Sequence, residues 1–563
     1  MHFVFHKPKN TRSSKLQIDH VMLFVFCSFN VQPLKPFVLQ GSQLNRLHRP
    51  DYRVGILAAL RALKIQSVIG LMITASHNKV SDNGVKVADP SGGMLSQDWE
   101  PFADTLTNVR DPQQLVHLIA EFVENEKIAV DGAKSVEILL ARDTRSSGES
   151  LVEAAKQGIS SIIGAVAHDL GILTTPQLHW MVRARNKGLK VSDNDYFKQL
   201  SSSFRCLVDL ITSGTHPSDV DDKLIRNSGK EGAGVLNEGV GADHVQKEKV
   251  VPCSFGSQDV GIRCASLDGD ADRLVYFIVP SRSSNKIELV DGDKILSLLA
   301  IFIKEQLSIL SKEIDVNGNN DYQRRLGIVQ TAYANRASTD YLKQLGLEVT
   351  FTPTGVKYLH EKAAKYDIGI YFEANGHGTI LFSEHYLRWL ETRTTELSDA
   401  FKGSEQQTAA LRILAVSELI NQAVGDALSG VLLVEVILKH MGWSIQRWNE
   451  LYQDLPSRQL KASFLGHLSI LWSVKVMDRT AVVTENAETV AVTPPGIQEA
   501  IDAETGFSLL IAVKYPRGRC SIRPSGTEDV IRVYAEASTQ NAADSLAKSV
   551  AKLVDQFLGF GSS

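Results

Sequence analysis

Several features that would place a chain in a special class are missing from this sequence of 563 residues. Its five cysteines are odd in number, scattered and without a CxxC pair, which argues against a disulfide framework or a thiolate metal site and suits free thiols in a reducing compartment. The apolar stretch at residues 21–31 is interrupted by Ser28 and Asn30 and is shorter than the ~18 residues that span a bilayer. We therefore predict a cytoplasmic protein with no membrane partner.

An excess of positive charge is also missing. The chain has 60 Lys and Arg residues against 64 Asp and Glu residues, for a net charge of −4 with histidine neutral. Such a balance gives no overall basic field that could hold the backbone of a nucleic acid. We therefore predict no nucleic-acid partner, and any anionic ligand must be held by local groups.

The remaining composition is that of a folded protein, with 43% hydrophobic and 22% charged residues. At roughly 150 residues per domain, the length predicts three to four domains. Apolar residues at helical spacing in residues 53–64 predict a helix, and the apolar run at 68–74 predicts a buried strand. Because such stretches alternate along the chain, the sequence predicts an α/β architecture.

The C-terminal segment shows this pattern most clearly. Residues 529–537 alternate between apolar and polar side chains, which predicts a strand. A helix is predicted after it, with Gly559 as its stop. Its apolar face would be formed by Ala543, Leu546, Ala547, Val550, Leu553, Val554 and Phe557.

Polar loops that contain side chains suited to catalysis or ligand binding follow four of the predicted strands. RDTRSSGES follows residues 136–141, DGDADR follows 264–267, EANGHG follows 368–372, and RPSGTED follows 519–522. Ligand sites in α/β sheets lie at the carboxyl ends of strands, so this placement favours a functional role for the loops.

The segment TASHN, which begins at Thr74, also follows a predicted strand directly. Ser76 could act there as a nucleophile or carry a phosphoryl group, with His77 and Lys86 close enough in sequence to supply protons or positive charge. Taken alone, the same pattern is more often a turn or a helix cap.

The DGDADR loop carries three carboxylates at alternate positions, Asp268, Asp270 and Asp272. In an extended loop these side chains point to one side and can converge on a hard cation, and the small residues between them let the backbone curve. Oxygen ligands favour Mg²⁺ over zinc. A calcium EF-hand is excluded, because its sixth position would need glycine and its twelfth glutamate, where this sequence has arginine and valine.

The RPSGTED loop is rich in groups that bind anions. Arg523 and Arg532 can each offer a planar guanidinium to phosphate oxygens, Ser525 and Thr527 add hydroxyls, and Gly526 lets backbone N–H groups approach closely. The alternative is a tight Pro-Ser-Gly hairpin with a surface arginine. The density of donors favours a phosphate-binding loop.

The EANGHG loop is weaker evidence when taken alone. Glu373 and Asn375 are separated by one residue and could bind neighbouring hydroxyl groups of a sugar. A single glutamate at a strand end is, however, more often a structural residue.

Taken together and in their order along the chain, the loops resemble those of the α-D-phosphohexomutase superfamily. The resemblance rests on ITASHN at residues 73–78, DGDADR at 268–273, EANGHG at 373–378 and RPSGTEDVIRVYAEA at 523–537. Further support comes from ARDTRSS at 141–147, LTTPQLH at 173–179, VLNEGVGAD at 235–243 and TPTGVKYL at 352–359. With Asn375, the EANGHG loop resembles the corresponding loop of the branch that acts on N-acetylglucosamine phosphates.

The resemblance implies a multi-domain fold with three α/β domains that contain mixed sheets and a smaller C-terminal α+β domain. The domains implied are an atypical N-terminal segment at 1–50, a phosphoserine catalytic domain at 51–195, a shortened metal-binding domain at 196–315, a sugar-binding domain at 316–455 and a phosphate-binding domain at 456–563.

The activity implied is the interconversion of N-acetylglucosamine 6-phosphate and N-acetylglucosamine 1-phosphate, for UDP-N-acetylglucosamine synthesis. Ser76 would be a phosphoserine that, with the three aspartates, binds one Mg²⁺ per chain, and a hexose 1,6-bisphosphate would be the intermediate or activator. His77, Lys86 and Arg273 are candidates for the general acid or base. The substrate-binding residues implied are Glu373, Ala374, Asn375, Arg523, Pro524, Ser525, Gly526, Thr527 and Arg532.

Two alternatives stay open at this point. One is another hexose phosphomutase, acting on glucose or mannose phosphates. The other is a catalytically impaired homologue that binds sugar phosphates. In each case the partner is a small sugar phosphate, with no obligate protein partner implied.

Overall fold

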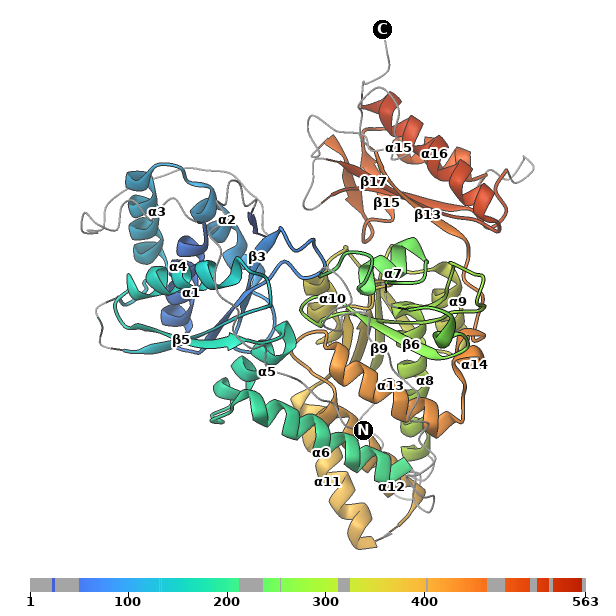
Figure 1. The fold of residues 1–563 in the computed structure, drawn as a ribbon, viewed down its shortest axis with the longest axis horizontal. Helices are drawn as coiled ribbons and strands as arrows, with labels where there is room; N and C mark the ends of the chain where they lie inside the picture. The colour runs from blue at the N-terminus through green and yellow to red at the C-terminus, as the bar shows by residue number, and fades with distance from the viewer. Residues whose placement is uncertain are drawn as a thin grey trace, which may run out of the picture. The chain divides into compact units, whose positions relative to one another are not determined.

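The computed structural model divides by its internal contacts into two units, which we describe separately. Figure 1 labels the helices and strands along the chain. Unit 1 contains residues 1–196, 212–272 and 276–289, and unit 2 contains residues 197–211, 273–275 and 290–563. The structure describes residues 23–25, 50–130, 132, 134–211, 236–253, 255–311, 325–400, 403–462, 481–506, 514–525 and 530–558.

A five-stranded sheet organises the N-terminal part of unit 1, with the order β1-β3-β2-β4-β5. Strands β2 and β3 are antiparallel, and the other neighbours are parallel. The strands are β1 (Leu23–Val25), β2 (Ile69–Ile73), β3 (Asn83–Ala88), β4 (Val136–Arg142) and β5 (Ala165–Ile172). The helices around them are α1 (Pro50–Ile65), η2 (Gln97–Trp99), α2 (Glu100–Asn108), α3 (Pro112–Asn125), α4 (Gly148–Ser160) and α5 (Thr175–Asn186).

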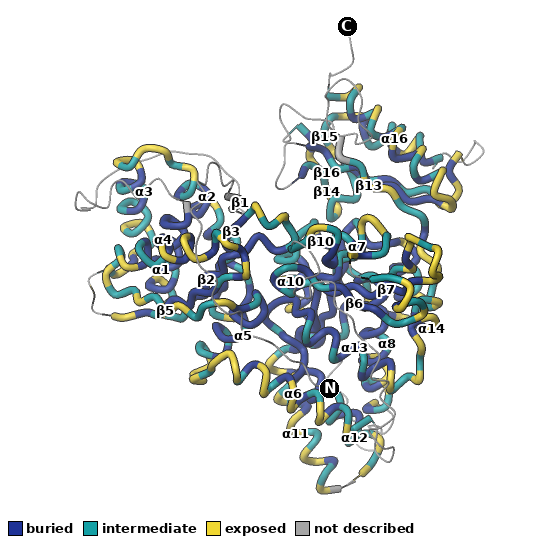
Figure 2. The backbone as a smooth tube through the Cα atoms, viewed as in Figure 1, coloured by how far each residue is buried: buried dark blue, intermediate teal, exposed yellow. Residues whose placement is uncertain are grey.

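This sheet is covered on both faces, which explains why β2 reads as one continuous apolar run. Alternate residues of β2 and β4 contribute to two separate hydrophobic clusters, one containing residues of α1 and α4 and the other residues of α5. Figure 2 shows β2 buried along its length. Helices α1 and α4 approach closely, since a Cβ on Gly158 would lie 1.9 Å from the carbonyl oxygen of Tyr52. The predicted helix at 53–64 and strand at 68–74 are confirmed as α1 and β2.

A second, three-stranded sheet has the order β6-β7-β8. The predicted strand at 264–267 is confirmed as β6, and the DGDADR loop follows it directly. The elements are α7 (Ala242–Glu248), η4 (Ser257–Asp259), β6 (Arg263–Leu267), β7 (Leu274–Ile278) and β8 (Glu288–Val290).

Unit 2 contains a four-stranded mixed sheet with the order β10-β9-β11-β12. Strand β9 is parallel to β10 and β11, whereas β12 is antiparallel to β11, so the EANGHG loop joins two neighbouring strands. The strands are β9 (Leu326–Thr331), β10 (Glu348–Thr352), β11 (Ile368–Phe372) and β12 (Gly378–Phe382). The helices are α6 (Asp193–Ile211), which begins in unit 1, α8 (Gly292–Leu310), α9 (Arg336–Gln344), α10 (Val356–Ala363), α11 (Glu384–Ala400), α12 (Glu405–Leu419), α13 (Ala427–Met441) and α14 (Ile445–Asn449).

The C-terminal part of unit 2 has a three-stranded antiparallel sheet in the order β13-β17-β16 and a separate hairpin. The predicted strand at 529–537 is confirmed as β17, and helix α16 buries Ala543, Leu546, Ala547, Val550 and Val554 as expected. Leu553 is only half-buried, and Phe557 was assigned wrongly to the buried face, because in the last turn its side chain is 36% exposed. The elements are β13 (Ser457–Ala462), β14 (Val483–Glu485), β15 (Val490–Thr493), α15 (Ile497–Thr505), β16 (Arg519–Pro524), β17 (Ile531–Glu536) and α16 (Gln540–Phe557).

Some sequence predictions fall outside the described residues. These are the N-terminal segment, apart from β1 and Pro50, the shortened region at 212–235, and the stop at Gly559. Among the helices that the structure describes, none combines the length and the hydropathy that crossing a bilayer would require.

Candidate active site

Ser76 lies in a tight turn immediately after β2 in unit 1. The backbone N–H of Asn78 donates to the carbonyl of Ala75 at 3.0 Å, and the N–H of Ser76 donates to the hydroxyl of Thr74 at 2.9 Å. Ser76 has a φ of 50°, in the left-handed region that residues other than glycine seldom occupy. Such a conformation persists only where the surrounding structure holds it.

Two side chains from distant parts of the sequence hold this turn. The guanidinium of Arg145 donates to the carbonyl oxygens of Ser76 at 3.0 Å and Asn78 at 2.8 Å. The amide of Asn237 donates to the same two oxygens at 2.8 and 2.9 Å. Arg145 is itself buried and paired with Asp143. The serine turn is therefore fixed by four hydrogen bonds that converge on two carbonyl groups.

Arg145 and Asn237 were not predicted as site residues. Arg145 belongs to RDTRSSGES, a loop at a strand end that also supported the resemblance, and Asn237 belongs to VLNEGVGAD, which only supported the resemblance. Their donors act on backbone carbonyls far away in sequence, so no local spacing could reveal the contact. An arginine in the loop that follows a buried strand is the one available signal, because a buried guanidinium needs partners.

The DGDADR loop lies against the serine turn. The hydroxyl of Ser76 is 2.9 Å from a carboxylate oxygen of Asp268 and 3.4 Å from one of Asp272. All three carboxylates of the loop are buried, and one oxygen from each lies within 4.8 Å of the others. A Cβ on Gly269 would lie 3.0 Å from the carbonyl oxygen of Ser76, so a larger residue there would crowd the serine turn. The structure thus brings together groups that are about 190 residues apart.

Lys86, on β3, contacts the same acids. Its ammonium is 2.7 Å from Asp270 and 2.6 Å from Asp272. Burial alone would lower the pKa of Lys86, but the two carboxylates outweigh it and raise the pKa above its ordinary value. Burial and the Asp272 charge would raise the pKa of Asp270, yet Lys86 and the hydroxyl of Thr175 hold it below the usual range. One ammonium against three carboxylates leaves a surplus of negative charge.

This surplus fits a hard divalent cation. Within the described ranges, the Oδ1 atom of Asp270 is buried and accepts no hydrogen bond. Carboxylate oxygens are the donors that Mg²⁺ prefers. Buried carboxylates at this separation would otherwise repel one another. The residues present therefore fit the predicted metal.

The LTTPQLH segment supports the acidic loop from α5. Thr175 donates its hydroxyl to Asp270 at 2.5 Å and its backbone N–H to the Asp270 carbonyl at 3.2 Å. Thr174 caps the helix. His179 is 2.6 Å from the carbonyl of Gly92, and burial lowers its pKa to about 4, so the imidazole is neutral at pH 7. Neutral His179 therefore donates from Nδ1 to Gly92.

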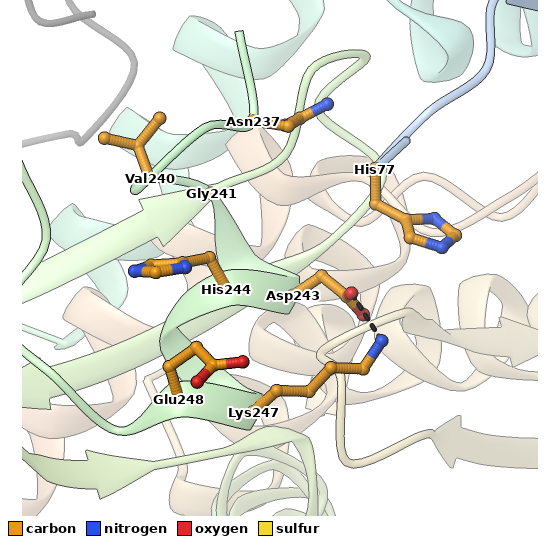
Figure 3. A pocket seen from close by; sticks show the side chains of 8 residues that line it. All are labelled: His77, Asn237, Val240, Gly241, Asp243, His244, Lys247 and Glu248. Atoms are coloured by element: carbon orange, nitrogen blue, oxygen red, sulfur yellow. Dashed lines mark hydrogen bonds and ion pairs between the residues drawn. The ribbon is translucent and has the colours of Figure 1, made fainter. Parts of the chain in front are cut away.

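His77 lines a pocket of ≈ 200 Å³ in unit 1. Figure 3 shows it opposite α7, from which Asp243 and Lys247 form an ion pair of 2.6 Å. The lining residues are His77, Asn237, Val240, Gly241, Asp243, His244, Lys247 and Glu248. His77 and Asn237 thus link this pocket to the serine turn.

In unit 2, the EANGHG loop forms a tight connection between β11 and β12. Its own backbone closes it, since the N–H of Glu373 donates to the His377 carbonyl at 2.9 Å. Asn375 is 3.4 Å from a carboxylate oxygen of Glu373. The carbonyl of Ala374 accepts a hydrogen bond from the backbone N–H of Gly292, the first residue of α8. The backbones of Arg273 and His377 form an isolated antiparallel β-bridge. Arg273 is therefore placed beside the predicted sugar-binding residues.

The predicted phosphate-binding residues lie on β16 and β17. Arg523 and Arg532 are directly opposite each other across the two strands. Like charges in this position destabilise a sheet, so the arrangement favours an anion between them. Arg532 donates to the hydroxyl of buried Ser525 at 3.3 Å, and Pro524 ends β16. Gly526 and Thr527 lie outside the described residues.

Comparisons with known proteins agree with this geometry. Residues 56–102 and 103–192 match a family model for phosphoglucomutase/phosphomannomutase, alpha/beta/alpha domain I. Residues 291–443 match phosphoacetylglucosamine mutase AMG1, domain III, and residues 471–553 match the phosphoglucomutase/phosphomannomutase C-terminal domain. The predicted multi-domain α/β fold with mixed sheets and a C-terminal domain is confirmed.

Two curated relatives show the extent of the similarity. The chain is 61% identical over 542 residues to phosphoacetylglucosamine mutase of Arabidopsis thaliana, which covers 90% of this chain and 92% of the relative. It is 39% identical to the enzyme of the same name from Homo sapiens, with 90% and 91% covered.

Solved structures give the same result. An Aspergillus fumigatus N-acetylphosphoglucosamine mutase in complex with GlcNAc-6P and magnesium is 35% identical, with a TM-score of 0.76 and coverage of 91% of this chain and 93% of that one. A serine-to-alanine variant of the mutase from the same fungus, in complex with glucose 1,6-bisphosphate, is 34% identical with a TM-score of 0.76 and coverage of 91% and 93%.

Proposed function

The chain belongs to the phosphoacetylglucosamine mutase family, and from this premise we propose that Ser76 carries the phosphoryl group with which it interconverts N-acetylglucosamine 6-phosphate and N-acetylglucosamine 1-phosphate. The observation that carries the proposal is the position of the Ser76 hydroxyl, buried and 2.9 Å from Asp268 in a cluster of three carboxylates. A hydroxyl there is fixed in a water-poor site beside a place for a cation.

Asp268, Asp270 and Asp272 would hold Mg²⁺, which when bound supplies charge stabilisation to a transferring phosphoryl group. The chain's own contribution is the orientation of Ser76. Arg145 and Asn237 fix the backbone of the turn, so the serine oxygen is held at one place before substrate arrives. Such preorganisation is the main demand of phosphoryl transfer.

In unit 2, the loop at the end of β16 would bind the phosphate that does not react. The opposed pair Arg523 and Arg532 supports this role, because an anion relieves their repulsion. The loop's other phosphate-binding residues would be Pro524, Ser525, Gly526 and Thr527, while Glu373, Ala374 and Asn375 would hold the sugar hydroxyls. The serine and this loop each serve both ends of the sugar, so a 1,6-bisphosphate intermediate must reorient between two transfers.

A general acid or base must handle the proton of the sugar hydroxyl. We keep His77, Lys86 and Arg273 as the candidates for this role. Their surroundings differ: Lys86 is bound to two carboxylates, His77 lines the pocket opposite α7, and Arg273 lies beside the EANGHG loop. Activity of alanine variants with a substrate bearing a good leaving group would separate them, because such a substrate needs no acid.

We also propose the domain division at residues 50, 195, 315 and 455, and a cytoplasmic location without nucleic-acid, membrane or obligate protein partners. The matches of family models to 56–192 and 471–553 support the boundaries at 50, 195 and 455, whereas the match to 291–443 begins before the proposed boundary at 315. Free thiols support a reducing compartment, since the cysteines of the described part, Cys206, Cys253, Cys264 and Cys520, form no disulfide. Cell fractionation with an antibody against the chain tests the location.

A coupled assay on the purified full chain with Mg²⁺ tests the activity. We expect turnover of N-acetylglucosamine 6-phosphate to exceed that of glucose and mannose 6-phosphates, and intact-mass analysis to show one added phosphoryl group. Faster turnover of an unacetylated sugar would indicate the glucose or mannose mutase instead. Binding without isomerisation and without a phosphoserine would indicate the impaired homologue.

The two hydrogen bonds from Asn237 to the serine turn predict how substitutions of Asn237 change the rate of phosphorylation. Asn237→Asp places a carboxylate oxygen against two carbonyl oxygens, whereas Asn237→Ala only removes the two donors. Each lost hydrogen bond is worth about 1 kcal/mol, so the loss of both corresponds to a slowing of roughly thirtyfold. We expect this slowing for phosphorylation of Ser76 by glucose 1,6-bisphosphate in the alanine variant, and a larger one in the aspartate variant. Rapid quenching followed by intact-mass analysis measures this rate.

The control is Asn285→Asp, which adds the same charge at an exposed position of unit 1. KM for the sugar phosphate should stay unchanged in both Asn237 variants, because the phosphate-binding loop is untouched. Equal rates for the alanine and aspartate variants would contradict the assignment of Asn237 as a donor.

A further inference from the structure

The hairpin of β14 and β15 in unit 2 has a strained tip. Asn486, Ala487 and Glu488 have φ values of 49°, 58° and 66°. None of the three is glycine, and each incurs a steric penalty in the left-handed region. Three such residues in a row persist only if contacts outside the tip hold them in place.

Glu488 makes those contacts. One oxygen of its carboxylate accepts from the backbone N–H of Thr354 at 2.9 Å and also from the hydroxyl of Thr354. The same oxygen is 3.6 Å from Nε of Arg523. The side chains of Glu488 and Arg523 are 17% and 14% exposed, so the contact is largely shielded from water. Thr354 lies in the TPTG segment, between β10 and α10.

Tyr333 also contacts Arg523 at Nε, the atom that Glu488 approaches. Nε of Arg523 donates to the hydroxyl of Tyr333 at 3.0 Å, and the guanidinium lies over the Tyr333 ring, 5.0 Å from the centroid. Nη1 donates to the carbonyl of Pro524 at 3.1 Å, next to the start of the predicted phosphate loop. Glu488 and Tyr333 thus occupy the Nε side of the guanidinium, and its Nη1 group contacts the start of the loop.

We propose that Glu488 is a positioning residue for phosphate binding, which fixes Arg523 and couples it to the TPTG segment. The proposal rests on the proposed function only in taking Arg523 as a phosphate ligand. The charge of Glu488 also offsets the repulsion between Arg523 and Arg532, which face each other across β16 and β17. Arg523 is therefore kept in its binding orientation before any phosphate arrives.

A carboxylate near an anion site could instead compete with phosphate. Two features favour positioning over competition. The Glu488 oxygen is already taken up by the two donors of Thr354. It also approaches Arg523 at Nε, whereas Nη1 donates to Pro524, so the contact with Glu488 does not occupy the Nη2 group that can meet an anion.

The test measures binding of inorganic phosphate by calorimetry, and kcat and KM for N-acetylglucosamine 6-phosphate, in the full chain with Mg²⁺. Glu488→Ala removes every contact, so we expect phosphate affinity to fall and KM to rise about tenfold, with kcat within about twofold. Glu488→Gln keeps an acceptor for Thr354 and loses only the charge, so its effect should be about threefold. The matched control is Glu485→Gln, at an exposed position of the same hairpin, with no effect expected.

A double-mutant cycle between Thr354 and Glu488 tests their coupling from the side of Thr354, which lies outside the tip of the β14–β15 hairpin. Thr354→Val keeps the backbone N–H and removes the hydroxyl, so it should weaken phosphate binding in the same direction, and the double variant with Glu488→Ala should be no worse than Glu488→Ala alone. Thermal unfolding midpoints identify a variant that has simply lost its fold.

Unchanged phosphate affinity in Glu488→Ala, or tighter binding, would overturn the proposal, since tighter binding would mean that the carboxylate competes with the anion. The failure of the proposed function has a different signature. A wild-type chain without turnover whose phosphate binding still weakens in Glu488→Ala would refute the mutase activity and leave the positioning role standing.

Discussion

Replacing Ser76 by alanine is expected to reduce turnover of N-acetylglucosamine 6-phosphate by at least ~10⁴-fold and to abolish the phosphorylated form of the protein. The reason is that the hydroxyl is the group that carries the phosphoryl, so its removal deletes a covalent step rather than weakening a contact. The neighbouring turn contacts go to backbone carbonyls, which the variant keeps. Incubation with labelled glucose 1,6-bisphosphate and peptide mapping measure the transfer directly.

A suitable control is Ser81→Ala, which removes an exposed hydroxyl from the same polar segment. It should retain full activity. Ser76→Thr keeps a hydroxyl but adds a branch at Cβ, which disfavours the φ of 50°, so we expect little rescue. Label found on another residue of wild-type protein, or substantial turnover in Ser76→Ala, would exclude Ser76 as the carrier.

The local sequence signal is strong for the acid loop, whereas for the serine it only marks a candidate position, and the resemblance to the family supplied the role. An apolar strand that ends in TASHN and another that ends in DGDADR place polar groups at the carboxyl ends of strands, and the alternate spacing of Asp268, Asp270 and Asp272 predicts convergence. The structure adds that the two loops touch, at 2.9 Å from Ser76 to Asp268. Local pattern alone could not show that, since the fold of about 190 intervening residues decides it.

Residues whose role depends on distant backbone could not be found in this way. Arg145 and Asn237 act on carbonyl groups of the serine turn, and Glu488 acts on Thr354 and Arg523. None of these contacts leaves a periodic or spaced signal in the sequence. Lys86 shows the intermediate case, because its nearness to Ser76 in sequence was informative, while its pairing with two carboxylates required β3 to lie beside the acid loop.

The helix at the C-terminus shows the limit of periodicity. Its helical spacing predicted seven residues on one face, and five of them are buried. Phe557 continues the spacing but is 36% exposed. Periodicity gives the direction of a side chain around the helix axis and says nothing of how far along the axis the neighbouring core extends.

Asp270→Asn is expected to abolish the response of the protein to Mg²⁺ and to lower turnover by roughly 10²- to 10³-fold. The amide matches the carboxylate in shape and still accepts from Lys86 and Thr175, so the loop should keep its course. The variant lacks the charge on Oδ1, the buried oxygen that accepts no hydrogen bond from described residues. A ligand that binds only the folded state stabilises it in proportion to the logarithm of its concentration over Kd. The unfolding midpoint of wild-type protein should therefore rise with Mg²⁺, and that of the variant should not.

The matched control is Glu149→Gln, which neutralises a carboxylate that is 88% exposed in the same unit and should leave the Mg²⁺ response intact. Without metal, the Asp270→Asn variant also loses one of the two carboxylates that raise the pKa of Lys86, so that pKa should fall. A normal Mg²⁺-dependent rise of the unfolding midpoint in Asp270→Asn would mean that the cation binds elsewhere. The acidic loop would then serve only to pair with Lys86, and the serine would need another source of positive charge.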